Sequence, residues 1–197
     1  MEIINLPPPQ TDFDFPLMKA LALRRTKRKW LEKPLSEQEI SNLLWAACGI
    51  TQPETKRAKS KRTVPSACNS QEINVYVVLE NGLFLYNETL HQLEKIHSDD
   101  MRQDIGTQKM MRSAPLGLVY VADFSKMKSL LFKSDQDKLI TASADTGFIS
   151  QNVYLYCAAA GLSTAVLGLV NRQKLHKTMK LNNNQRVMYS QVVGLLS

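Results

Sequence analysis

The sequence predicts an α+β fold, a sandwich in which helices flank a mostly antiparallel sheet. Asn81-Gly82 separates two runs of apolar residues, which is the pattern of a tight β-hairpin. Segments with helical and strand periodicity follow one another irregularly, unlike the strict order of a doubly wound sheet. No Gly-x-Gly-x-x-Gly run follows a predicted strand, so the sequence carries no dinucleotide-binding fingerprint.

A single globular domain accounts for most of the chain. Its 197 residues are 44% hydrophobic and 22% charged, which is typical of one soluble core. Pro7-Pro8-Pro9 keeps the N-terminus extended, so we predict an arm over residues 1–15 and one domain over residues 16–197. The sequence has neither the roughly 20-residue apolar stretch of a membrane span nor a signal-peptide pattern. We expect no membrane partner and a cytoplasmic location. The sequence does not show whether a targeting segment preceded Met1.

The cysteines and histidines indicate neither a disulfide framework nor a metal site. The three cysteines are scattered and form no Cys-x-x-Cys pair. The three histidines lie on separate predicted elements without the spacing of metal ligands. We therefore expect reduced thiols and predict no metal centre.

Two helices are predicted early in the chain. Residues 17–25 carry apolar side chains at helical spacing and end on a cluster of cations. Ser36 followed by Glu39 is a capping-box pattern, which begins a second helix that ends at Gly49.

Strands and helices alternate in the rest of the chain. Ala114-Pro115 separates a helical pattern from a continuous apolar run, and Gly161 has the position of a helix C-cap. In chain order we predict strands over 73–79 and 83–86, a helix over 99–112, a strand over 116–122, a long helix over 135–160, a strand over 163–169, a helix over 173–180 and a strand over 191–196.

Positive charge is concentrated in two tracts. The formal net charge is +7, and much of the excess lies in residues 24–29 and 56–62. The second tract has no aromatic residue between its cations for base stacking, which favours a solvated loop over a nucleic-acid site. Attraction of a phosphorylated dinucleotide or another polyanion stays open as an alternative.

The first tract and a later polar turn form the most specific pattern in the sequence. The tract reads Arg24-Arg25-Thr26-Lys27-Arg28, and about forty residues later the turn reads Pro65-Ser66-Ala67-Cys68-Asn69-Ser70-Gln71. Cations suit a phosphate dianion, and small side chains after a proline let the backbone approach a planar ring. Both segments resemble the N-terminal flavin-binding segments of the nitroreductase family, FMN-dependent oxidoreductases that use NADH or NADPH. The resemblance extends loosely over residues 16–197.

The resemblance implies a fold and a role for each residue of these segments. The fold is the nitroreductase-like sandwich, built as a homodimer. Arg24 and Arg25 would bind the phosphate, Thr26 would donate its hydroxyl, and Arg28 would lie near the flavin ring. The turn would reach across the dimer, so that each flavin is shared between two chains. Its predicted contacts are Pro65, Ser66, Ala67, Cys68, Asn69 and Gln71.

A third segment resembles the family strand that passes the flavin N5 atom. It runs over residues 161–168, and a backbone N–H of Leu167 or Gly168 would hydrogen-bond N5. No catalytic side chain is therefore predicted. Gln108 would face the edge of the ring.

The C-terminal end departs from the family pattern. Many members carry a Lys or Arg pair after the last strand, whereas the sequence given ends at Ser197 without one. Either Arg24, Arg25 and a further cation such as Arg172 would suffice for the phosphate site, or FMN would be held more weakly.

The function implied by the resemblance is ping-pong hydride transfer from NADH or NADPH through flavin N5 to an oxidised acceptor. Nitroaromatics and quinones are candidate acceptors, and the short azoline dehydrogenases of the family add a peptide azoline. Two alternatives stay open, a noncatalytic flavin-binding protein of the same fold and a polyanion-binding module. The physiological acceptor and the preferred nicotinamide are not specified by the sequence.

Overall fold

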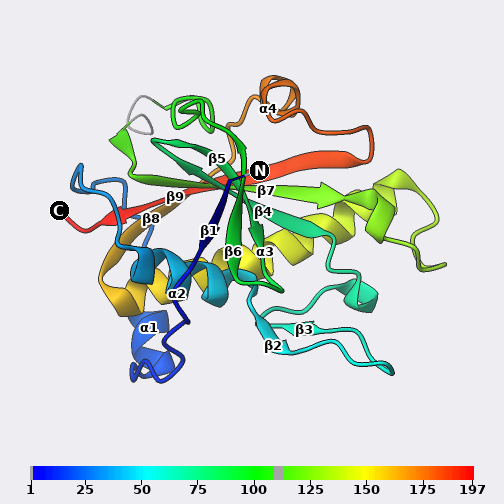
Figure 1. The fold of residues 1–197 in the computed structure, drawn as a ribbon, viewed down its shortest axis with the longest axis horizontal. Helices are drawn as coiled ribbons and strands as arrows, with labels where there is room; N and C mark the ends of the chain where they lie inside the picture. The colour runs from blue at the N-terminus through cyan, green and yellow to red at the C-terminus, as the bar shows by residue number, and fades with distance from the viewer. Residues whose placement is uncertain (1, 109–112) are drawn as a thin grey trace.

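A seven-stranded antiparallel sheet forms the centre of the fold (Figure 1). A computed structural model of the chain describes residues 2–108 and 113–197. Along the sheet the strand order is β1-β6-β5-β4-β7-β9-β8, and Ile50–Gln52 (β2) pairs separately with Lys61–Arg62 (β3). The strands of the main sheet are Ile3–Asn5 (β1), Ile73–Leu79 (β4), Gly82–Asn87 (β5), Gln92–His97 (β6), Leu116–Asp123 (β7), Leu162–Leu167 (β8) and Gln185–Leu195 (β9).

Helices cover both faces of this sheet. The helices are Leu17–Leu23 (α1), Glu37–Cys48 (α2), Asp135–Ala160 (α3) and Arg172–Thr178 (α4), with short 3₁₀ turns at Ala67–Asn69 (η1) and Phe124–Lys126 (η3). In Figure 1, α2 and α3 lie on one side of the sheet and α4 lies on the other. Within the described residues, no helix combines the length and the apolar surface that crossing a bilayer requires.

The central strand β7 shows why the sheet is buried on both sides. Leu118 and Tyr120 belong to the apolar core that includes residues of α2 and α3. Val119 and Val121, which alternate with them, belong to a second core that includes Leu175 of α4. Because successive side chains of a strand point to opposite faces, this continuous apolar run fills two cores.

The predicted α+β class, with a mostly antiparallel sheet between helices, is confirmed. The hairpin closes where predicted, with Leu79 opposite Gly82. Ser36 and Glu39 form the reciprocal capping box of α2. Gly161 ends α3 with a φ of 70°, in the left-handed region that glycine adopts without a steric penalty.

The predicted helix over 99–112 is wrong in its described part. Residues 99–108 form turns and bends instead, and residues 109–112 lie outside the described residues. The Asp100 Oδ1 atom accepts a hydrogen bond from the Arg102 backbone N–H at 3.0 Å, and the two side chains form an ion pair. This Asx turn competes with helical hydrogen bonding. The Arg102 guanidinium also lowers the pKa of the Asp100 carboxyl.

Strand pairing extends beyond the predicted segments. Ile3–Asn5, inside the predicted arm, pairs with β6 at one edge of the sheet. The sequence prediction missed β6 itself and began β9 at residue 191 instead of Gln185. Polar residues at 185, 186, 190 and 191 obscure the strand pattern, yet Gln185 already pairs with Asp123 of β7.

The capping box at the N-terminus of α3 can be tested by mutation. This helix contacts both segments of the candidate site described below. Ser134 Oγ accepts from the Asp137 N–H at 3.1 Å, and Asp137 accepts in return from the Ser134 N–H at 3.0 Å. We predict that Ser134→Ala lowers the free energy of unfolding by about 1 kcal/mol, because the first turn loses its cap. Urea denaturation measures this loss. Ser134→Asp keeps a capping side chain and serves as the control, and equal stabilities of the two variants would contradict the prediction.

Candidate functional site

The basic segment after α1 lies along the free edge of β8. Lys27 donates its backbone N–H to the Thr164 carbonyl at 3.0 Å, and Leu31 donates to the Leu195 carbonyl at 3.0 Å. β8 is the last strand of the sheet, so its outer edge would otherwise be unpaired. The sheet edge therefore fixes the path of the backbone from Arg24 to Leu31.

Tyr154 of α3 anchors the same segment from the other side. Its hydroxyl lies 3.0 Å from the Thr26 hydroxyl and accepts a hydrogen bond from the Val166 N–H at 3.1 Å. The Arg24 guanidinium lies 5.3 Å from the centre of the Tyr154 ring, within range of a cation–π interaction. Sequence reasoning missed Tyr154, because a tyrosine on a helix gives no sign of so distant a partner.

The basic segment carries positive charge that no acidic side chain neutralises within the described residues. None of the ion pairs there involves Arg24, Arg25, Lys27 or Arg28. Arg25 caps the C-terminal end of α1, because its Nη1 donates to the carbonyls of Ala22 and Arg24. A phosphate dianion fits this set of donors, because several cations follow one another in the chain and none of them is paired with a carboxylate within the described residues.

A small cavity lies beside the basic segment. It has a volume of about 90 Å³ and is lined by residues that include Lys27, Tyr154 and Thr164. Sites for drug-sized ligands usually measure about 300 to 1,000 Å³. One chain alone therefore does not enclose a cofactor of that size here.

The polar turn contains a strained backbone. Cys68, Asn69 and Gln71 have φ angles of 54°, 49° and 52°, although none of them is glycine. Such left-handed conformations persist when the surrounding contacts determine them, and they are common at functional sites. Pro65 and Cys68 are exposed, whereas Ser66, Ala67 and Asn69 are half-buried.

Amide side chains that were expected to contact a cofactor bond instead to Ser60, which precedes the turn. Asn69 Nδ2 donates to the Ser60 carbonyl at 3.0 Å, and Gln71 Nε2 donates to the same carbonyl at 2.6 Å. The Ser66 hydroxyl oxygen accepts the Gln71 N–H at 3.0 Å. The hydroxyl hydrogen of Ser66 is not used in that contact, so it can serve a ligand.

Two buried carboxyls lie beneath the turn. Asp145 of α3 accepts the Ala67 N–H at 2.9 Å, and Glu72 lies 2.8 Å from the Ser70 hydroxyl. The exposed fractions are 4% for Asp145 and 0% for Glu72. Burial and the neighbouring Glu72 raise the pKa of Asp145 to about 6, against the opposing effect of the Ala67 N–H.

The sequence does contain a signal for Asp145. Asp145 is the only charged residue between Lys138 and Arg172. A lone charge on a helix that packs against a sheet is costly without hydrogen-bond partners. Such a residue is therefore a candidate for a specific structural or functional contact.

The end of β8 presents a backbone edge next to the basic segment. Thr164 and Val166 use the free edge of β8, so the alternating residues, including Leu167, face β9. Gly168 is exposed, and a side chain there would meet no atom within 4 Å. The Thr107 N–H donates to the Leu169 carbonyl at 3.3 Å, which places exposed Gln108 near this end of β8.

The structure thus brings together the basic segment, the end of β8 and Gln108, but holds the turn elsewhere on α3. Tyr154 and Asp145 are nine residues apart on this helix. That spacing is about 14 Å along the helix axis and about half a turn around it. Figure 1 shows α1 beside the C-terminal end of α3.

Arg172 does not join the basic segment as the sequence suggested. Its guanidinium donates to the carbonyls of Val187 at 3.2 Å and Met188 at 2.8 Å. These bonds attach the beginning of α4 to β9. Arg172 therefore has a structural role that its sequence position did not reveal.

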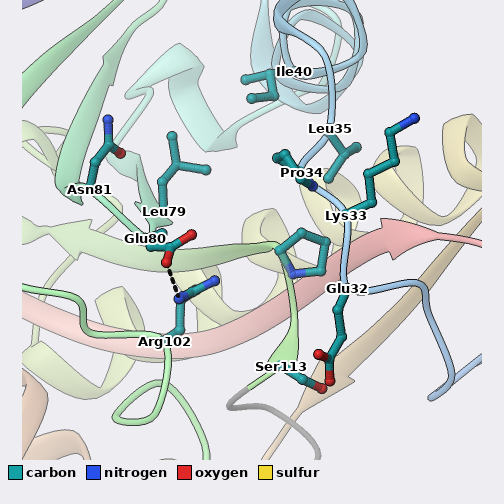
Figure 2. A pocket seen from close by; sticks show the side chains of 11 residues that line it. Glu32, Lys33, Pro34, Leu35, Ile40, Leu79, Glu80, Asn81, Arg102 and Ser113 are labelled. Atoms are coloured by element: carbon teal, nitrogen blue, oxygen red, sulfur yellow. Dashed lines mark ion pairs between the residues drawn. The ribbon is translucent and has the colours of Figure 1, made fainter.

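None of the predicted site residues lines a larger cavity of about 810 Å³. Figure 2 shows it between the segment before α2 and the β4–β5 turn, with Glu80 facing Arg102 at 3.8 Å. Leu35, Ile40 and Leu79 form an apolar part of its wall. The lining carries charges of both signs and contains no residue of the predicted motifs. We therefore treat this cavity as distinct from the candidate site. Across the described residues no cluster of three potential metal ligands occurs.

Comparison with known proteins places this geometry in one family. The sequence profile described as "Nitroreductase family" matches residues 21–195. A protein of Methanocaldococcus jannaschii named as a candidate nitroreductase is 25% identical over 175 residues, covering 84% of each chain.

Solved structures with the same fold include a candidate nitroreductase. The crystal structure of a candidate nitroreductase from Ralstonia eutropha JMP134 is 35% identical, with a TM-score of 0.89 over 99% of this chain and 90% of that one. The NADPH:FMN oxidoreductase of Vibrio harveyi, solved with NAD⁺, shares the fold at 16% identity and a TM-score of 0.65, over 91% of this chain and 68% of its own. The chain belongs to the nitroreductase family.

Proposed function

We propose that the chain is an FMN-dependent NAD(P)H oxidoreductase whose flavin sites are shared between the two chains of a homodimer. Membership of the nitroreductase family makes it a flavin-dependent oxidoreductase in general class. Bound FMN would supply the redox chemistry, accepting hydride from NADH or NADPH and passing it to an oxidised acceptor in a ping-pong cycle. The chain's own residues would bind and orient the reactants.

The observation that carries this proposal is the un-neutralised basic segment beside the exposed end of β8. Arg24 and Arg25 would hold the phosphate, and Thr26 would contribute its hydroxyl. Arg28 would place a positive charge near the ring, which favours the reduced anionic cofactor over the oxidised one. Of the two backbone donors considered for N5, Gly168 is the better candidate, because Leu167 faces Ser190 of β9.

An unpartnered apolar surface supports the dimer. Ile140 and Phe148 of α3 are 61% and 46% exposed, and Leu17 and Met18 of α1 are 62% and 75% exposed. Gly147, on the same side of α3, leaves space for close approach of another backbone. A second copy packed here would cover these side chains and could bring its turn to the first copy's basic segment.

The acceptor is proposed only as a class. Nitroaromatics and quinones are the candidate acceptors that the family resemblance implies, whereas a peptide azoline would be oxidised to the azole and would reduce the flavin in place of the nicotinamide. The Vibrio harveyi relative, whose name specifies NADPH and FMN, supports the pairing of a nicotinamide donor with this flavin.

Anaerobic titration tests the function directly. We expect the purified protein, after incubation with FMN, to be yellow and to lose its flavin absorbance when NADH or NADPH is added. A yellow protein that neither nicotinamide bleaches would support a noncatalytic flavin-binding protein. A colourless protein that rejects FMN yet binds DNA with a steep salt dependence would support a polyanion-binding module.

Arg24→Gln tests the phosphate contact. We predict a roughly 10- to 100-fold weaker affinity for FMN, because one charge-assisted contact is lost. Riboflavin, which has no phosphate, should bind both proteins equally. Fluorescence quenching measures both affinities. Lys56→Gln, in the exposed second tract, is the charge-matched control, and equal losses in the two variants would point to nonspecific attraction.

A mixing experiment tests whether the site is shared. Neither Arg24→Gln/Arg28→Gln nor Cys68→Trp, which fills the exposed side of the turn, should bind FMN alone. Random heterodimers of the two variants should recover about a quarter of the wild-type sites, since each heterodimer has one intact site. Co-refolding followed by FMN titration provides the measurement. Absence of recovery in heterodimers that have been shown to form would place both segments of each site on one chain.

A further inference from the structure

A third cavity adjoins the polar turn and is lined mainly by cations. Its volume is about 430 Å³, and Ser70 and Gln71 of the turn form part of its wall. Half of the cavity's cations come from the second basic tract of the sequence and half from the segment after β7. The charged residues that line it are Lys59, Arg62, Lys126 and Lys128, with Glu88 as their acidic neighbour. The proposed flavin site uses none of these cations.

The acidic side chains around this cavity are engaged with other groups. Glu88 pairs with the Arg62 guanidinium. Glu72 Oε2 lies 2.8 Å from the Ser70 hydroxyl, and Asp123 caps the η3 turn. Within the described residues, no ion pair involves a lysine that lines the cavity. The three lysines are therefore available to an anion from outside the chain.

Lys126 shows that positive charge in this cavity is held at a cost. Burial lowers its pKa, and the neighbouring charge of Arg62 lowers it further, while the three carboxylates named above except that of the capped helix ends act in the opposite direction. The Lys126 ammonium donates to the Gln71 carbonyl at 3.3 Å and to Asn74 Oδ1 at 2.7 Å. An ammonium carries three hydrogens, so one remains for a ligand. A bound anion would offset both the burial and the repulsion.

Lysines also connect the cavity to the backbone of the turn. Lys59 Nζ donates to the Asn69 carbonyl at 3.4 Å, just as Lys126 donates to the Gln71 carbonyl. A ligand in the cavity would therefore lie next to the turn. In the homodimer proposed above, this turn contacts the flavin, so the ligand would lie close to the reacting molecules.

The chemistry of the cavity fits a phosphate group attached to a sugar. Lysine binds phosphate as a point charge, and several lysines can neutralise a dianion. The volume lies within the range of small-molecule sites, so it has room for more than a free phosphate. A dinucleotide whose nicotinamide ring meets the flavin extends beyond the ring with its adenosine half. In NADPH that half carries a 2′-phosphate, which NADH lacks.

We propose that the cavity binds the 2′-phosphate of NADPH through Lys59, Lys126 and Lys128, and that the chain therefore prefers NADPH to NADH. Arg62 would add positive charge from behind these lysines, since its guanidinium is already paired with Glu88. The link to hydride transfer rests on the function proposed above, whereas the phosphate site itself does not.

The affinities of NADP⁺ and NAD⁺ test the site, because these nucleotides differ only in the 2′-phosphate. We expect isothermal titration calorimetry on the full chain to give a dissociation constant roughly tenfold lower for NADP⁺, and Lys59→Gln/Lys128→Gln to bring the two constants close together. Both substituted lysines are exposed, so the fold should persist. Lys56→Gln/Lys133→Gln removes two exposed cations that do not line the cavity and should keep the wild-type ratio. A wild-type ratio of one, or equal losses in the two double variants, overturns the proposal.

Competitors separate the possible sources of the phosphate and the possible sites. Inorganic phosphate should displace NADP⁺ only in large excess. Displacement at equal concentrations would mean that the cavity takes free phosphate, and displacement by a short DNA duplex would mean that it takes a polyanion. Arg24→Gln should keep the preference for NADP⁺, and loss of the preference in this variant would assign the 2′-phosphate to the basic segment. Each of these three results contradicts the proposal.

Lysine acetylation locates the bound nucleotide without any flavin. With limiting acetic anhydride and mass spectrometry as the readout, NADP⁺ should protect Lys59 and Lys128 more than NAD⁺ does. The exposed Lys56 and Lys133 should be modified equally with either nucleotide. Equal protection of Lys59 and Lys128 by the two nucleotides would contradict the assignment.

Turnover separates this proposal from the proposed function. The ratio of kcat/KM for NADPH to kcat/KM for NADH should fall about tenfold in Lys59→Gln/Lys128→Gln and stay unchanged in Lys56→Gln/Lys133→Gln. A protein that rejects FMN but still prefers NADP⁺ would refute the flavin function and leave the phosphate site intact. A flavoprotein that both nicotinamides bleach equally, and that binds NADP⁺ and NAD⁺ equally, would refute the phosphate site and leave the function intact.

Discussion

The candidate site depends on α3, which makes polar contacts with two separate segments of the chain. Tyr154 joins α3 to the basic segment and to β8, and Asp145 joins the same helix to the polar turn. A helix is stiff over this length, so the position of each segment is set by the packing of α3 on the sheet. Movement of α3 would displace both segments together, which makes its burial a condition for any chemistry at the site.

The arrangement supports the proposal that the site is shared between two chains. The two segments leave α3 at points separated by about 14 Å and by half a helical turn. Each segment has an unmet requirement, un-neutralised cations in one and strained, partly exposed backbone in the other. An anionic planar cofactor between two copies would satisfy both requirements, and the exposed apolar side chains of α1 and α3 provide a surface on which the copies can meet.

Local signals predicted the elements that depend on local physics. The Asn81-Gly82 hairpin, the Ser36 capping box and the Gly161 cap all act within a few residues, and all are present. The predicted helix over 99–112 failed in its described part because the Asp100 side chain bonds the backbone in competition with a helix. β1 was missed because an edge strand takes its stability from its neighbour.

In the candidate site, too, local motifs were predicted and contacts between separate parts of the chain were not. Its motif residues were found because their spacing resembles a known family, and the structure places Arg24 to Arg28 beside the end of β8. The bonds of Asn69 and Gln71 to Ser60 and of Arg172 to β9 span 9 to 16 residues. The contacts of Tyr154 with Thr26 and of Asp145 with Ala67 join more distant parts of the chain. A single sequence does not specify such pairings, because it does not show which surfaces meet.

A crystal structure of the full chain grown with FMN tests the central claim most directly. The account predicts that Arg24 and Arg28 of one protomer and Ser66 of its partner contact the same FMN, with the Gly168 N–H nearest to N5. A cofactor bound wholly within one chain, or lodged in the 810 Å³ cavity between Lys33 and Asn81, would contradict it.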